Sequence, residues 1–98
     1  MKLNRFRYIG FFVMGKLESG QNFLLLREKF CELFGKVSLE ESNIQLILQK
    51  QKFFVIKVNQ AYEEKILIAS CFLPLLSLFT TSSVKKSKEK IKILENSI

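Results

Sequence analysis

The sequence has no histidine, no aspartate and no tryptophan, and only one proline and two cysteines among its 98 residues. Without histidine there is no imidazole base, no Ser-His or Cys-His pair and no histidine ligand for a metal. Two cysteines cannot supply the four ligands of a structural zinc site. All nine acidic residues are glutamate, so acid–base chemistry would rest on glutamate and lysine alone. We therefore expect a chain that binds no cofactor and is not an enzyme by itself.

Hydrophobic residues are abundant, at 48% of the chain, and they include ten phenylalanines. This composition favours one folded domain over residues 1–98. A domain of this size buries only about 60–65% of the surface of its unfolded chain, so part of the apolar material should stay outside. That part is either scattered over the surface, as is normal, or gathered into a face that docks another subunit.

The positive charge lies at the two ends of the chain. Residues 1–16 hold four basic residues and no acidic one, a net charge of +4. Residues 84–98 hold five lysines and two glutamates, a net charge of +3. Residues 17–83 have seven basic and seven acidic residues, a net charge of zero. Two basic ends on a neutral body indicate a polyanionic partner if the ends converge in space, and solvated termini if they do not.

The longest uncharged stretch covers residues 66–84, a length of 19 residues. Its apolar part, residues 66–79, has only 14 residues and is interrupted by Pro74, which is typical of a core segment rather than a membrane span. Residues 1–14 lack the small-residue cleavage pattern of a secretion signal. Cys31 and Cys71 stand in apolar helical contexts, so we expect both to be small buried residues. We expect the protein to lie in the cytoplasm, a reducing compartment.

Hydrophobic periodicity predicts four strands and three helices. Apolar residues at every second position, together with β-branched or aromatic residues, indicate the strands. Apolar residues three and four positions apart indicate the helices, and Gly35 and Pro74 mark two helix ends. The predicted elements are a strand over 4–14, a helix over 23–34, strands over 43–49 and 53–58, a helix over 60–73, a strand over 75–80 and a last helix capped by Ser82 or Ser83.

The order β-α-β-β-α-β with a C-terminal helix predicts a ferredoxin-like α+β fold with an antiparallel sheet. Two helices would cover one face of the sheet. We expect the first and third strands in the centre, parallel to each other, and the fourth strand antiparallel beside the first. Arg5 and Arg7 would then lie close to residues 81–83, where the lysines of the last helix begin. The two basic ends would therefore converge.

RNA-recognition modules of the RRM type share this strand order and stack bases on sheet aromatics. Their third strand carries a basic residue, glycine and alternating aromatics, whereas residues 52–56 contain no glycine. Tyr8 or Phe12 could stack a base, but both are expected to pack inside the molecule or at a subunit interface. The sequence therefore favours recognition through phosphates and RNA shape.

Four motifs occur in order along the chain. Arg7-Tyr8-Ile9 opens the first strand, Leu33-Phe34-Gly35 ends the first helix, Asn43 precedes the second strand, and Thr81-Ser82-Ser83-Val84-Lys85-Lys86-Ser87-Lys88 follows the fourth. Together, over residues 5–92, they resemble the ribonuclease P protein component 2 family, the Pop-five subunit of archaea and eukaryotes. The chain is similar to a reduced or divergent member of the archaeal type. Ser82 stands where the family has glycine, and Lys85-Lys86 where the basic pair often includes arginine.

The resemblance implies a protein subunit that does not cleave RNA by itself. Members of the family bind the catalytic domain of the ribonuclease P RNA together with a barrel-fold protein subunit. That RNA, with magnesium, removes the 5′ leader from precursor tRNA. Magnesium is thus expected on the partner RNA and not on this chain.

Two sets of site residues follow. The predicted RNA-binding residues are the basic and hydroxyl side chains near the two ends: Arg5, Arg7, Ser82, Ser83, Lys85, Lys86 and Lys88. The predicted partner-docking residues lie on the second helix, which is apolar over more of its circumference than one sheet can cover: Ile66, Leu67, Phe72 and Leu73, with Ile68 beside them. The expected occupant of this surface is a protein subunit or a second copy of the chain.

Two alternatives stay open. One is a ferredoxin-like domain that docks a protein or senses a small ligand without any nucleic acid, for which the basic ends would be dispensable. The other is a membrane-associated protein in which residues 66–79 insert into the bilayer; we expect no membrane partner.

Overall fold

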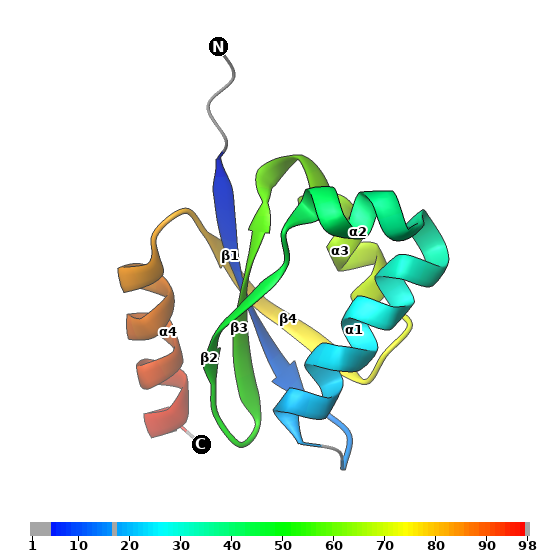
Figure 1. Cartoon of the computed structure of the whole chain (residues 1–98). Coiled ribbons are helices and arrows are strands. Elements are labelled where there is room, and N and C mark those ends of the chain that lie inside the picture. Colours follow the sequence, from blue (N-terminus) through cyan, green and yellow to red (C-terminus); the bar gives the residue numbers. More distant parts are fainter. Residues whose placement is uncertain (1–4, 17, 98) are drawn as a thin grey trace.

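The computed structural model describes residues 5–16 and 18–97, and Lys2 and Asn4 of the basic N-terminal segment lie outside that range. It consists of a four-stranded antiparallel sheet with helices on both faces (Figure 1). The elements are β1 (Phe6–Val13), α1 (Ser19–Phe34), α2 (Lys36–Ser42), β2 (Gln45–Gln49), β3 (Phe53–Asn59), the 3₁₀ turn η1 (Gln60–Tyr62), α3 (Glu63–Ser70), β4 (Leu75–Thr81) and α4 (Val84–Ser97). The ferredoxin-like α+β prediction with a C-terminal helix is confirmed.

The strand order is β2-β3-β1-β4, so β1 and β3 are central as expected. β1 pairs antiparallel with both β3 and β4, and the expectation that β1 and β3 are parallel was wrong. The crossover through α1 returns the chain into β2 in the direction of β1. β3 then reverses at the turn after Gln49, so it must run against β1.

The larger core lies between the sheet and helices α1 and α3. Alternate residues of β1 point to this face and are fully buried or nearly so, because successive strand side chains face opposite sides. The rings of Phe11 and Phe54 stack at a centroid distance of 5.3 Å, and Phe30 of α1 is fully buried in the same core cluster. Ile66 of α3 completes this layer with no exposed surface.

The opposite face of the sheet is covered by α4 (Figure 1). Ile91 of α4 is buried against Phe53 and Val55, and Tyr8 and Phe12 pack around them. The rings of Phe12 and Phe53 lie 5.3 Å apart. The interpretation of Tyr8 and Phe12 as packed residues is therefore confirmed, because a helix covers the face on which RRM modules stack bases.

Three details differ from the sequence predictions. Helix α1 begins at Ser19 rather than Phe23, and the second predicted helix ends as α3 at Ser70, followed by a turn to Pro74. The seven-residue helix α2 was not predicted, because so short a segment shows no apolar periodicity.

The Tyr62 hydroxyl donates a hydrogen bond to Glu41, which links η1 to α2. This hydrogen bond, together with desolvation, raises the pKa of Tyr62.

The uncharged stretch divides between α3, a turn and β4, and contributes Ile66, Ala69 and Leu75 to the core. Among the described residues, no helix combines the length and the apolar character that crossing a bilayer requires. Cys31 is partly buried, but Cys71 is exposed, contrary to expectation, because the turn after α3 leaves it outside the core.

Gly10 provides a test of how β4 packs. It pairs with Phe79 beside a register shift, and a Cβ added at Gly10 would lie 2.4 Å from Phe79 Cε1. Gly10→Ala should therefore displace the ring towards α4 and lower the free energy of unfolding by roughly 1–3 kcal/mol. Urea unfolding measures this loss. Phe79→Leu in the same chain should recover part of it, and equal losses with and without the ring would contradict the contact.

Candidate nucleic-acid interface

Strand register brings distant parts of the chain together at one end of the sheet. Phe6 pairs with Asn59 at the end of β3, and the backbone N–H of Gln60 donates a hydrogen bond of 2.8 Å to the Arg5 carbonyl. On the other side of β1, Tyr8 pairs with Thr81, the last residue of β4. The start of β1 thus lies between the residues that follow β3 and those that follow β4.

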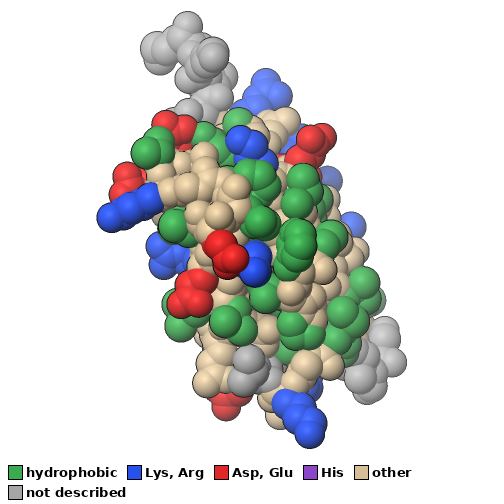
Figure 2. All heavy atoms as spheres, turned by 90° about the vertical axis from the view of Figure 1, so that its right-hand side faces the viewer, with side chains coloured by type: hydrophobic (Ala, Val, Ile, Leu, Met, Phe, Trp, Pro, Cys, Tyr) green, Lys and Arg blue, Asp and Glu red, His purple; other side chains and the backbone are tan. Residues whose placement is uncertain are grey.

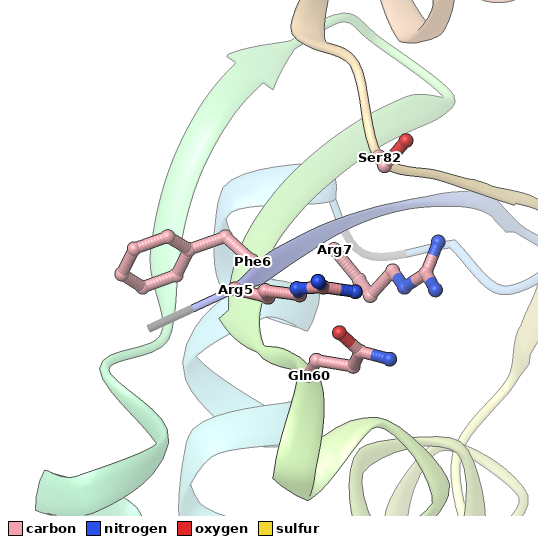
Figure 3. Close-up of a pocket in the computed structure, with 5 residues that line it drawn as sticks. All are labelled: Arg5, Phe6, Arg7, Gln60 and Ser82. Atoms are coloured by element: carbon pink, nitrogen blue, oxygen red, sulfur yellow. The ribbon is translucent and has the colours of Figure 1, made fainter. Parts of the chain in front are cut away.

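A pocket of about 300 Å³ lies at this end and is lined by Arg5, Phe6, Arg7, Gln60 and Ser82. The two guanidinium groups and the Gln60 amide extend in the same direction, with the Ser82 hydroxyl across from them, while the Phe6 ring points the opposite way (Figure 3). This alternation is the normal consequence of strand geometry at consecutive positions. The prediction that Arg5 and Arg7 converge with the exit of β4 is confirmed.

Positive charge exceeds negative charge at this pocket. Arg7 Nε lies 4.0 Å from Glu63 Oε2, which is within ion-pair range but too long for a hydrogen bond. Arg7 Nε is buried and has no hydrogen-bond partner among the described residues. On the far side of Phe6, Lys57 Nζ lies 4.2 Å from the ring centroid. At the pocket one carboxylate therefore stands against two guanidinium groups, while Lys57 lies with Phe6 on the other side of β1.

The donors of this pocket suit a phosphate group. Guanidinium groups present several N–H donors in a planar fork that matches phosphate oxygens, and they stay charged at all physiological pH values. The Gln60 amide and the Ser82 hydroxyl add neutral donors. Among residues 5–16 and 18–97, no group of three cysteine or glutamate side chains could hold a metal ion. The two guanidinium groups, the Gln60 side chain and the Ser82 hydroxyl are donors that can bind an oxyanion.

Ser83 has a structural role at the start of α4. Its hydroxyl oxygen accepts a hydrogen bond of 3.4 Å from the Lys86 amide, and its own amide donates one of 3.3 Å to Thr81 Oγ1. The prediction that Ser82 or Ser83 caps the last helix is confirmed for Ser83. Ser82 is exposed and lines the pocket instead.

The predicted RNA-binding residues do not all line one pocket. Lys85 and Lys86 are exposed on the first turn of α4, a few residues from Ser82. Lys88 instead lines a groove between α4 and β2, together with Lys50 and other residues. Seven residues were expected on a single surface, and the structure places Arg5, Arg7 and Ser82 in one pocket and Lys88 in another.

The predicted docking residues also divide. Ile66 is fully buried in the core, so its assignment as a docking residue is wrong: α3 turns this side chain towards the sheet. Leu67 and Leu73 are partly buried and pack against the core. Phe72 is 62% exposed, with Lys29 Nζ 5.8 Å from its ring centroid, and Ile68 is 50% exposed.

The exposed residues belong to a wider apolar surface. Hydrophobic side chains form a band down the face that carries α1, α2 and α3, with charged side chains mostly at its margins (Figure 2). The large hydrophobic residues exposed on these helices are Leu24, Leu33, Val37 and Ile68. The band is thus broader than the single helix considered from the sequence.

Sequence reasoning missed several residues near the pocket and the groove. Gln60 and Lys57 lie at the end of β3, and the predicted parallel pairing of the first and third strands placed that end away from the start of β1. Lys50 and Lys92 lie in segments interpreted as a turn and a solvated helix face. Only the strand order combined with the helix periodicity could have indicated these residues. Neither segment reveals that combination by itself.

The cap of α4 gives a second testable prediction. Ser83→Ala removes the side-chain acceptor of the Lys86 amide and should cost about 1 kcal/mol of stability. Ser83→Asn keeps an acceptor and should restore most of that loss. Ser82→Ala is the matched control, expected to leave the urea midpoint unchanged because Ser82 is exposed. Equal destabilisation by both alanine variants would contradict the assignment of Ser83 as the cap.

Comparison with known proteins identifies a likeness of fold. No protein-family model matches the chain, and no curated protein matches its sequence. One solved structure with a similar chain is the cryo-EM structure of yeast ribonuclease MRP, with a TM-score of 0.68 and 12% sequence identity. The match covers 100% of this chain and 99% of that chain. The whole domain therefore shares its fold with a component of the yeast ribonuclease MRP structure.

Proposed function

We propose that this chain is a non-catalytic protein subunit of a ribonucleoprotein ribonuclease of the ribonuclease P or MRP kind. The pocket of Arg5, Arg7, Gln60 and Ser82 is the observation that carries the proposal. It presents two guanidinium groups and two neutral donors against one carboxylate, at the point where Arg5 and Arg7 meet the exit of β4. The end-to-end likeness to a chain of yeast ribonuclease MRP supports the same reading.

The finer form of the proposal follows the resemblance to the Pop-five family. The chain would bind the catalytic RNA of ribonuclease P and support removal of the 5′ leader from precursor tRNA. Magnesium would be held by that RNA. The absence of histidine and aspartate from the sequence agrees with a subunit that leaves the chemistry to RNA.

The mode of binding follows from which side chains are free. Tyr8 and Phe12 are packed under α4, so base stacking on the sheet would require the helix to leave. Arginine and lysine side chains near Ser82 remain exposed or line the pocket. Phosphate contacts position a protein on RNA and carry little sequence information. Recognition should therefore depend on the shape of the RNA backbone.

The apolar band over α1 to α3 supports the proposal that the chain works in a complex. Monomeric proteins seldom expose continuous apolar patches of large size, and such patches mark interaction sites. The proposed occupant is the barrel-fold protein subunit that the resemblance implies, or a second copy of this chain. Phe72 and Ile68 are its most exposed members on and after α3.

The same band favours a second candidate function, a protein-docking domain with no nucleic-acid partner. Under that reading the apolar helices are the working surface and the basic pocket has no ligand. The two functions differ in one measurable property: only an RNA-binding subunit loses its function when Arg5 and Arg7 lose their charge.

Binding to structured RNA provides the direct test. If about four to six phosphates are contacted, log Kd should change with log salt with a slope of roughly 4 to 5 in magnitude. Arg5→Gln with Arg7→Gln should weaken binding broadly and lower that slope by about 1 to 2. Filter binding over a salt series measures this, with ribonuclease P RNA beside an unrelated duplex.

The matched control for this experiment is Arg27→Gln with Lys36→Gln. It also removes two exposed charges, but from α1 and α2, neither of which contributes a residue to the lining of the pocket. An equal slope change in both double variants would contradict a specific basic surface. Equal affinity for every RNA, even with the protein partner present, would keep the surface but remove the support for a ribonuclease P RNA.

Self-association gives a test of the apolar band. Ile68→Ser with Phe72→Ser should lower dye binding and reduce the association of the purified protein at micromolar concentrations, because it removes two exposed apolar side chains. Light scattering measures the association. Ile93→Ser on α4, where the side chain is 64% exposed, is the control and should change neither result. A wild-type protein that is monomeric and binds no dye would count against the docking surface.

A further inference from the structure

A second basic site lies in the groove between α4 and β2. The groove has a volume of about 380 Å³ and is lined by Leu48, Lys50, Lys88, Ile91 and Lys92. Ile91 is a buried core residue and Leu48 is partly buried, so they form an apolar floor. The three lysines are exposed and line the groove from both of its sides. The groove is therefore apolar at its base and positive along its rim.

Helix periodicity explains why these lysines face β2. Residues 88, 91 and 92 share one face of α4, because positions three and four apart lie on the same side of a helix. Lys90 lies on the other side of Ile91, where its Nζ is 5.6 Å from the centroid of the Phe79 ring of β4. The helix thus sends one set of lysines towards β2 and another towards β4. Lys85 lies one turn before Lys88, on the same stripe.

The charge of the groove has one sign. Among the described residues, those that line it include no carboxylate. Lys88 and Lys92 are one helical turn apart, a rise of about 6 Å along the axis, and Lys50 approaches from the end of β2. Lysine ammonium groups act as point charges with rotatable donors, so they neutralise an extended anion without demanding one fixed orientation.

The edge of β2 argues against a protein strand as the occupant. The pairing of β2 with β3 shifts register between Leu46 and Leu48, which marks a bulge. Bulges disturb the regular row of backbone groups that an added strand would need. The groove therefore offers side-chain charge rather than a continuous backbone template.

We propose that this groove binds a second stretch of RNA phosphodiester backbone, distinct from the Arg5 and Arg7 pocket. The proposal rests on the proposed RNA-binding function and extends it to this second site. Lys85 and Lys86 are exposed at the start of α4, between Ser82 of the pocket and Lys88 of the groove in the sequence, and the 14 residues of α4 span about 20 Å. One RNA backbone segment can follow the helix from the pocket to Lys50. A polyanion that extends along the helix explains why α4 carries lysines on both sides of its buried stripe.

The test measures both sites in the full chain. Lys88→Gln with Lys92→Gln should weaken binding to structured RNA and lower the salt slope by about 1 to 2. Lys50→Gln should lower the slope by about half as much. Arg27→Gln with Lys36→Gln is the matched control. In parallel, amine acylation with and without RNA, read by mass spectrometry, should show protection of Lys50, Lys88 and Lys92 while Lys36 stays reactive.

The outcomes separate this inference from the proposed function. If the wild-type protein binds structured RNA with no salt-dependent affinity, the proposed function fails. If it binds with a steep slope, and the Lys88/Lys92 variant matches the control and these lysines stay reactive, the second site alone is overturned. Protection of the three lysines by poly-glutamate but not by RNA would assign the groove to an acidic protein partner and overturn the inference too. Circular dichroism of each variant checks that the fold is retained.

Discussion

The pairing of β1 with β3 on one side and β4 on the other is the interaction on which the rest of the structure depends. β1 has partners along both of its edges, in registers that run from Phe6 to Phe12 against β3 and from Tyr8 to Val13 against β4. Because the two partners run antiparallel to β1, the chain leaves both of them beside its start. Gln60 and Ser82 lie near Arg5 for this reason alone, although they are far away in sequence.

The geometry of the same strand explains why Arg5 and Arg7 line a pocket while the residues that follow on the same face are packed in the core. Arg5 and Arg7 share their face of the strand with Ile9 and Phe11, which are fully buried under the helices. The layer of helices on this face begins with Glu63 in the first turn of α3. The side chains of Arg5 and Arg7, which precede Ile9, therefore lie at the edge of that layer. There a long cationic side chain can keep its stem against the protein and its charged group in water. A shift of one residue in register would place these charges under α4 instead.

Periodicity and turn residues were enough to predict the fold class, the central position of β1 and the approach of Arg5 and Arg7 to the exit of β4. They were not enough for α2, since seven residues without an apolar stripe have no period to detect. They were also not enough to choose among apolar residues of one helix. Ile66 and Ile68 are chemically alike, and only the angle at which α3 packs on the sheet makes one fully buried and the other half exposed. Lys50 and Lys88 become neighbours through the packing of α4 on the sheet, which is a tertiary contact that no local pattern carries.

Under the proposed function, helix α4 decides which kind of RNA recognition is open to this domain. An open sheet of the same topology would offer Tyr8, Phe12 and Phe53 to unpaired bases, and such stacking reads single strands. Here Ile91 is buried against Phe53 and Val55, so uncovering the sheet would expose a core cluster to water at a cost of several kcal/mol, on the scale of about 1.5–3 kcal/mol for each large apolar side chain. The lysines on the outer sides of that helix need no such opening. The packing that removes the aromatic platform thus presents a row of cations in its place, and a row of cations recognises the course of a phosphate backbone rather than the identity of its bases.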